Sequence, residues 1–160
     1  MTQPSDADLI AFVVREARML DEHRFEEWLT LFAEDGKYWM PLEWGQTDPV
    51  LTGSLMYEDP LLLRIRVERL KGNRTFSQKP KSRCHHVLQT PTVDSRDDAV
   101  GDYHLYTPFH YVETRQDEQT LYAGWARHHL VLRDGALRIK LKRVDLVNCD
   151  AAFGNIQLFM

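Results

Sequence analysis

Two long segments in the second half of the chain alternate apolar and polar side chains, and this period of two constrains the fold more than any other feature. Successive side chains of a β-strand point to opposite faces of its sheet. Residues 100–115 therefore predict a long strand with two distinct faces. One face carries Tyr103, Leu105, Thr107, Phe109 and Tyr111, and the other carries His104, Tyr106, His110 and Val112.

Residues 120–133 predict a second strand, and Asp134-Gly135 gives a tight-turn signal before a third alternating segment. An Asp-Gly pair between alternating segments is typical of a two-residue hairpin. In the third segment, Leu137, Ile139 and Leu141 are expected on one face and Arg138, Lys140 and Lys142 on the other. The inward set then moves to even numbers at Val144 and Leu146. This shift predicts a bulge near Lys142-Arg143 or a strand buried on both faces.

The N-terminal region has a helical pattern instead. Apolar residues recur at helical spacing over residues 6–21 and predict an amphipathic helix with Ser5 as its N-cap. These residues are Leu9, Phe12, Val13, Ala17 and Leu20. A second helix is expected over residues 24–33, with its end near Gly36.

A short aromatic strand over residues 37–41 and a long loop over residues 43–58 are expected next. A third helix is expected from Pro60 to about Leu70, ended by Gly72. Helices followed by long antiparallel strands predict one α+β domain over residues 1–160, in which the helices cover one face of a curved sheet.

Composition limits the classes of function. No apolar run approaches the roughly 18 residues of a membrane span, and residues 1–6 lack the basic and apolar regions of a secretory leader. We therefore expect a cytoplasmic protein without a membrane partner, in which Cys84 and Cys149 are free thiols. Residues 64–83 carry eight basic side chains. Because the chain is acidic overall and the basic run has few aromatics, nucleic-acid binding is not expected. This leaves a solvated helix face or a protein-facing basic patch.

The segment Ser82-Arg83-Cys84-His85-His86-Val87 resembles half of a metal site. A Rieske cluster needs a Cys-x-His and a Cys-x-x-His pair, but the residue three places after Cys149 is Ala152. Adjacent side chains on a strand point apart, so a zinc site here would be incomplete. A composite site of His86, His104 or His110 across neighbouring strands stays open as a minor alternative. The sequence therefore predicts no metal site, no cofactor site and no catalytic residue.

A cone-shaped enzyme is a second alternative. Small cone-shaped enzymes of the ketosteroid isomerase, scytalone dehydratase and polyketide cyclase type place His and Asp inside the cone for proton transfer. The candidates for such a buried pair are His86, His104, His110 and Asp102. The opposing interpretation is that these histidines are bonded to backbone groups at strand edges or interfaces.

The C-terminus is unusually apolar. Chain ends fray unless they are held, so we expect Ile156, Leu158 and Phe159 to dock on their own domain or on a partner.

Three ordered motifs carry a resemblance to a known family. They are the Glu16–Asp21 segment with Trp28-Leu29 and Tyr38–Pro41, the segment Ser82–His86, and Arg143–Asn148 with Asn155-Ile156. Together they resemble the small (beta) subunit of bacterial aromatic-ring-hydroxylating dioxygenases, and the likeness runs from about Leu9 to Met160. It departs from the family pattern at Cys84 and Thr90.

The resemblance implies a cone-like fold of the nuclear-transport-factor-2-like or cystatin-like type, with helices on a strongly curved sheet. It implies a non-catalytic structural subunit of an NADH-dependent, O₂-incorporating dioxygenase in the catabolism of aromatic compounds. The Rieske 2Fe-2S cluster and a mononuclear non-heme iron are then expected in a large (alpha) subunit, in a three-plus-three hexamer with a trimeric core of small subunits. The residues expected to act at subunit interfaces or in structure are Arg83, His86, Arg143, Asp145, Asn155, Ile156, Leu158 and Phe159.

Overall fold

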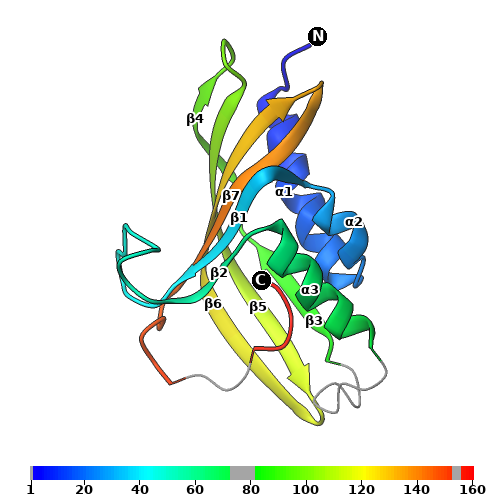
Figure 1. Cartoon of the computed structure of the whole chain (residues 1–160), viewed down its shortest axis with the longest axis vertical. Helices are drawn as coiled ribbons and strands as arrows, with labels where there is room; N and C mark the ends of the chain where they lie inside the picture. The colour runs from blue at the N-terminus through cyan, green and yellow to red at the C-terminus, as the bar shows by residue number, and fades with distance from the viewer. Residues whose placement is uncertain (1, 73–81, 153–155) are drawn as a thin grey trace.

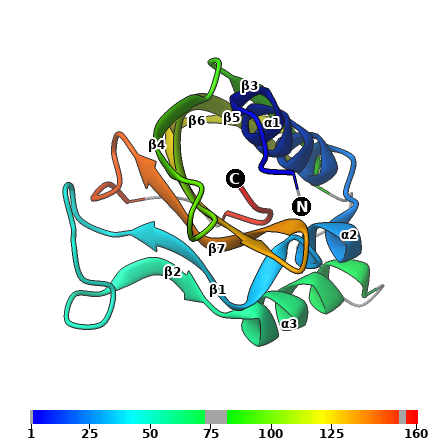
Figure 2. The same ribbon diagram turned by 90° about the horizontal axis from the view of Figure 1, so that it is seen from above.

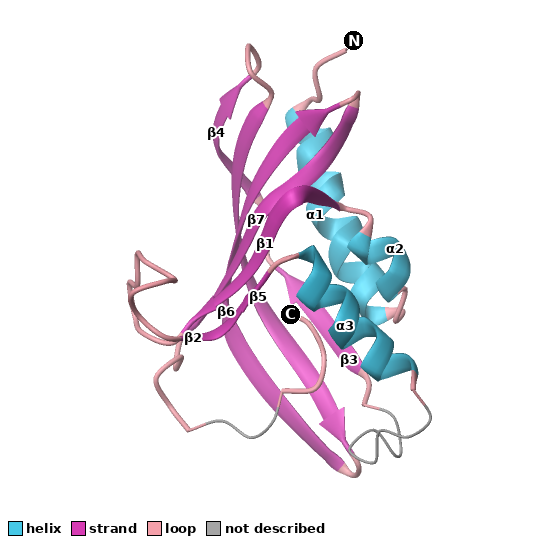
Figure 3. Ribbon diagram, viewed as in Figure 1, coloured by secondary structure: helices cyan, strands magenta, loops and turns pink. Residues whose placement is uncertain are grey.

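Helices cover one face of a strongly curved, seven-stranded sheet, which curls around them as a cone (Figures 1 and 3). The computed structural model describes residues 2–72, 82–152 and 156–160. Its helices are α1 (Asp6–Asp21), α2 (Phe25–Leu29) and α3 (Pro60–Lys71). Its strands are β1 (Phe32–Pro41), β2 (Ser54–Glu58), β3 (Cys84–Leu88), β4 (Thr92–Asp97), β5 (Asp102–Arg115), β6 (Glu118–Arg133) and β7 (Ala136–Leu146).

The sheet runs in the order β2-β1-β7-β6-β5-β3, and β4 also pairs with β5. All pairs are antiparallel except β1 with β7. The predicted α+β class with a mainly antiparallel sheet is therefore confirmed. The hairpin of β6 and β7 is confirmed as well, and its turn residues Asp134 and Gly135 have φ angles of 52° and 77°, as a type I′ turn requires.

Helix α1 begins where the sequence predicts it. The Ser5 hydroxyl accepts the Asp8 backbone N–H at 3.1 Å, and the Asp8 carboxylate accepts the Ser5 backbone N–H at 2.8 Å. This reciprocal capping box satisfies two N–H groups that the first turn leaves without helical partners. The apolar face of α1, from Leu9 to Leu20, is buried in the cone.

The second helix is shorter than predicted. Helix α2 ends at Leu29, and the chain enters β1 at Phe32, where it runs parallel to β7 beside Ile139. Pairing with β7 buries Phe32 and Ala33 in the sheet, and this tertiary pairing outweighs local helix propensity. Gly36 lies in the irregular part of β1 and does not end a helix; a Cβ there would meet the carbonyl oxygen of Ile139 at 2.6 Å.

The expected loop over residues 43–58 is also only partly correct, since its last five residues form β2 and pair with β1. The bulge in β7 exists, but it lies two residues earlier than predicted. His129 pairs with Leu141 and Leu130 pairs with Ile139, so Lys140 is the extra residue. The expectation that Lys142 faces outward is therefore wrong: beyond the bulge its side chain points into the cone and is buried.

Candidate functional site

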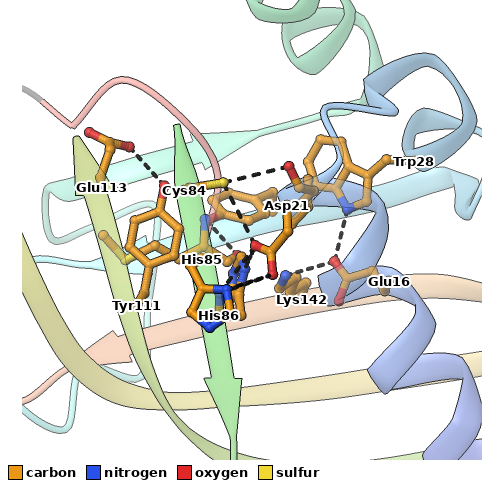
Figure 4. Close-up of polar contacts among 12 residues, drawn as sticks. Glu16, Asp21, Trp28, Cys84, His85, His86, Tyr111, Glu113 and Lys142 are labelled. Atoms are coloured by element: carbon orange, nitrogen blue, oxygen red, sulfur yellow. Dashed lines mark hydrogen bonds and ion pairs between the residues drawn. The ribbon is translucent and has the colours of Figure 1, made fainter. Parts of the chain in front are cut away.

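The interior of the cone contains three carboxylates, two of them on α1 and one on β5. Glu16 and Asp21 are on α1, and Glu113 is near the end of β5 (Figure 4). Glu16 and Glu113 are buried, and the Asp21 side chain is 21% exposed. Buried carboxylates need partners, so the donors around each one define what the site can do.

Glu16 holds four elements together. Its Oε1 accepts a hydrogen bond from His128 Nε2 on β6 at 2.8 Å. Its Oε2 accepts from Trp28 Nε1 on α2 at 2.8 Å and from Lys142 Nζ on β7 at 2.6 Å. Burial by itself would raise the pKa of Glu16, but the charge of Lys142 and the contacts with His128 outweigh it and hold that pKa well below the ordinary value. Glu16 is therefore an ionised, fully bonded group.

Asp21 joins the end of α1 to β3. Its carboxylate accepts from Nδ1 of His86 at 2.6 Å and from the His86 backbone N–H at 3.0 Å. The Cys84 thiol lies 3.8 Å from the same carboxylate and 3.5 Å from the Leu20 carbonyl oxygen. Burial and the negative charge of Asp21 raise the pKa of Cys84 to about 12. A thiol in this state is a poor nucleophile and a poor metal ligand.

His86 Nε2 is buried and has no hydrogen-bond partner among the described residues. The His86 ring lies 4.8 Å from the ring of Tyr111 and 6.3 Å from that of Phe109, measured between centroids. One ring nitrogen is therefore fixed by Asp21, while the other faces an aromatic surrounding. This geometry orients the ring and anchors β3 to α1.

Glu113 binds the C-terminal segment. Its carboxylate accepts the backbone N–H groups of Gln157 and Leu158, each at 2.8 Å, and the Tyr111 hydroxyl at 2.8 Å. The segment enters the space between the sheet and the helices and ends inside the cone (Figures 1 and 2). The expected docking of the tail thus takes place within its own chain.

Aromatic packing completes this attachment. The Phe159 ring lies 4.5 Å from the Trp28 ring and 5.9 Å from the Tyr38 ring. The Tyr38 hydroxyl donates to the carbonyl oxygen of Met160 at 3.1 Å. The last three residues are all buried, at 2–3% exposure. The tail is therefore packed into the interior of the cone.

The residues expected at interfaces have several different environments. The interior of the fold contains the side chains of His86, Leu158 and Phe159. Ile156 is half-buried, and Arg83 is exposed. Asn155 lies outside the described residues.

Arg143 and Asp145 form a pair on β7, with Arg143 Nε 2.8 Å from the Asp145 carboxylate. The guanidinium of Arg143 also stacks over Trp39, 4.4 Å from its ring centroid. The pair is partly shielded from solvent, because the two side chains are only 15% and 7% exposed.

Of the candidates for a buried His/Asp pair, only His86 faces the interior. His104 and His110 are exposed on the outer face of β5, and Asp102 is half-buried on the same face. The groups that do lie inside, Glu16 and His128, were not singled out from the sequence. A usable signal was present, since Glu16 lies four residues after Phe12 and four before Leu20 and therefore shares their helix face.

A Rieske cluster does not fit this chain. The thiol of its Cys-x-His half is directed at Asp21, and no second Cys-x-x-His half exists in the sequence.

No described helix is long and apolar enough to cross a membrane.

Comparisons with known proteins agree with the geometry. The family model of the ring hydroxylating beta subunit matches residues 15–151. The 2-halobenzoate 1,2-dioxygenase small subunit of Burkholderia cepacia is 27% identical over 91% of this chain and 90% of its own length. A benzene 1,2-dioxygenase subunit beta of Pseudomonas putida is 30% identical over 74% of this chain and 68% of its own length.

Solved structures show the same relationship. The beta subunit of the benzoate 1,2-dioxygenase from Burkholderia mallei superposes with a TM-score of 0.75 at 28% identity, covering 92% of this chain and 94% of its own. A scytalone dehydratase-like protein from Novosphingobium aromaticivorans reaches a TM-score of 0.61 at 15% identity, covering 84% of this chain and 78% of its own, and shares the fold alone. The chain therefore belongs to the family of ring-hydroxylating dioxygenase beta subunits, which act in a complex with a large subunit.

Proposed function

We propose that this chain is the non-catalytic structural subunit of an NADH-dependent, O₂-incorporating aromatic-ring dioxygenase that serves the catabolism of aromatic compounds. The Rieske 2Fe-2S cluster and the mononuclear iron would lie in the large subunit. The observation that carries the proposal is the set of contacts that hold the C-terminal tail and the buried carboxylates inside the cone. The tail occupies the cone, and the oxygens of Glu16 and Glu113 are bonded to donors from the chain itself.

The roles of the residues in the three motifs divide by location in this proposal. His86, Leu158 and Phe159, which are buried in the chain, would stabilise the fold. Arg83 on the surface, and the shielded Arg143 and Asp145 pair, would contribute to subunit contacts. The half-buried Ile156 would help to hold the tail in the cone, and Asn155 is proposed to act in structure or at a subunit contact.

Exposed apolar side chains support the existence of a partner surface. Trp44 is 66% exposed and stacks edge-on against Trp125. Val147, which is 53% exposed, lines the same surface pocket as Trp125. Leu121 and Leu51 are 61% and 87% exposed. Contiguous exposed apolar patches favour burial against another chain, and Trp44, Trp125 and Val147 are the side chains that lie together here. We infer a three-plus-three hexamer, with a trimeric core of these single-domain small subunits, in the cytoplasm.

Co-expression with the cognate large subunit tests the proposal. Native mass spectrometry is expected to give a trimer for this chain alone and a six-chain complex for the pair, with dioxygenase turnover only in the complex. The proposal fails if the two chains form no complex, or if this chain alone converts a substrate by isomerisation, dehydration or cyclisation.

A further inference from the structure

Three potential metal ligands meet on the outer face of the sheet, away from the buried carboxylates. Asp102 and His104 are two residues apart on β5, so their side chains share a face. His129 on β6 pairs directly with His104 across the strands. Adjacent antiparallel strands place such cross-strand side chains about 5 Å apart at their Cβ atoms. Backbone pairing alone therefore brings the three side chains together.

The ligand atoms already lie close to coordination distances. Asp102 Oδ1 is 3.0 Å from His104 Nε2, and Asp102 Oδ2 is 2.7 Å from His129 Nε2. One ligand atom from each of the three residues lies within 4.8 Å of the other two. Zinc ligands about 2.0–2.1 Å from the ion at tetrahedral angles are about 3.3 Å apart. The ligand atoms are at most 4.8 Å apart, and tetrahedral coordination needs about 3.3 Å between them. They would therefore have to approach one another by at most about 1.5 Å.

The side chains have room for this movement. The two imidazoles stack with ring centroids 4.2 Å apart and an interplanar angle of 21°. His104 is 48% exposed, Asp102 34% and His129 26%, so water can reach the ion and complete its coordination. A surface pocket of about 320 Å³ adjoins the histidines. Its lining includes Asp94, a further carboxylate, and Arg127, whose guanidinium lies over the Tyr106 ring.

We propose that Asp102, His104 and His129 form a binding site for a divalent transition metal ion, and Zn²⁺ is the probe used to test it. Two imidazoles and one carboxylate suit several metals, and the open positions match an ion that keeps solvent ligands. An exposed site cannot exclude competing ions by enclosure, so several divalent ions would bind; Zn²⁺ ranks above Fe²⁺ and below Cu²⁺ for nitrogen and oxygen ligands.

This proposal differs from the expectation of no metal site, because the three ligands come together only through the pairing register of β5 and β6. Spacing in the sequence points to ligands within the segment at Cys84 and, across strands, to His86, His104 or His110. The pairing of His104 with His129, and the position of Asp102 diagonal to His129, follow only from the β5 and β6 alignment.

Isothermal titration calorimetry of Zn²⁺ into the full, chelator-treated chain tests the proposal. The wild type is expected to bind one Zn²⁺ per chain. His104→Asn and His129→Asn should each weaken binding by about tenfold or more, since even supporting residues of metal sites have effects of this size. His110→Asn is the matched control, because His110 lies on the same face of β5 outside the cluster, and it should bind as the wild type does.

Co²⁺ gives a second measurement that does not depend on heat. Nitrogen coordination should produce visible ligand-field absorption in the wild type and in His110→Asn, but not in His104→Asn. Circular dichroism of each variant checks the fold. Of the three ligands, His104 is the most exposed, so its substitution should disturb folding least. The proposal is overturned if the wild type shows no saturable Zn²⁺ binding, if both cluster variants bind like the wild type, or if His110→Asn loses binding equally.

Discussion

Replacing Glu16 by Gln tests the buried network most sharply, because it removes one charge while keeping the side-chain volume. The Glu16 carboxylate accepts three hydrogen bonds, from His128, Trp28 and Lys142. The single amide oxygen of Gln can accept at most two. One donor therefore loses its acceptor, and the Lys142 ammonium, only 3% exposed, is left without a counter-charge.

Removing one partner of a buried ion pair typically costs about 3–5 kcal/mol. We expect a decrease of that size in the free energy of unfolding, measured by urea titration with circular dichroism at neutral pH. For a chain of this length each kcal/mol lowers Tm by about 2–4 °C. Adding Lys142→Met should recover part of the loss, because the uncompensated charge is then also removed. Glu27→Gln, which breaks an exposed pair with Arg24 on α2, is the matched control and should cost less than about 1 kcal/mol.

The pH dependence has a definite sign. The folded-state pKa of Glu16 lies below its ordinary value of 4.5. Its contribution to stability is therefore complete above pH 4.5 and is lost as the pH falls toward the folded-state pKa. The stability difference between the wild type and Glu16→Gln should narrow in acid. A loss below about 1 kcal/mol at neutral pH, or a difference that widens in acid, would refute the argument.

Three further outcomes are expected. Phe159→Ala removes the ring packed on Trp28 and should lower the free energy of unfolding by about 3–5 kcal/mol in urea titrations; a loss below about 1 kcal/mol would mean that the tail is not anchored there. Gly124→Ala places a Cβ against the carbonyl oxygen of Asp145 on the paired strand and should cost about 1–3 kcal/mol, so an unchanged Tm would contradict the close approach. The half-buried Cys84, with its pKa raised to about 12, should react slowly with a thiol reagent at about pH 8 and faster after unfolding, and an equally fast reaction in the folded chain would contradict the raised pKa.

Local signals predicted the elements that depend on local chemistry. The cap at Ser5, the Pro60 start and Gly72 end of α3, and the turn at Asp134-Gly135 all occur where expected. Each of these signals acts through backbone groups a few residues away. The alternation of β5 and β6 is equally direct, because period two fixes the faces of a strand.

The features that the sequence did not predict depend on pairing between strands far apart in the chain. The parallel contact of β1 with β7 converted the end of the expected second helix into a strand. The position of the bulge at Lys140 decided the orientation of Lys142, since a shift of one residue exchanges the faces of a strand. With Lys142 assigned outward, the network around Glu16 could not be predicted. The cluster of Asp102, His104 and His129 could not be predicted for the same reason, because it depends on the register between β5 and β6.

Whether this subunit supports catalysis without taking part in it can be measured by turnover of the assembled dioxygenase containing Asp21→Asn. This variant keeps the shape of the side chain but alters the Asp–His pair that lies on the inner side of the sheet, that of Asp21 with His86. The account predicts that the assembled, iron-loaded complex has an unchanged kcat per mononuclear iron, even if the variant chain is less stable. General acid–base groups contribute about 100-fold or more to rate, so a loss of that size in an intact complex would contradict the account.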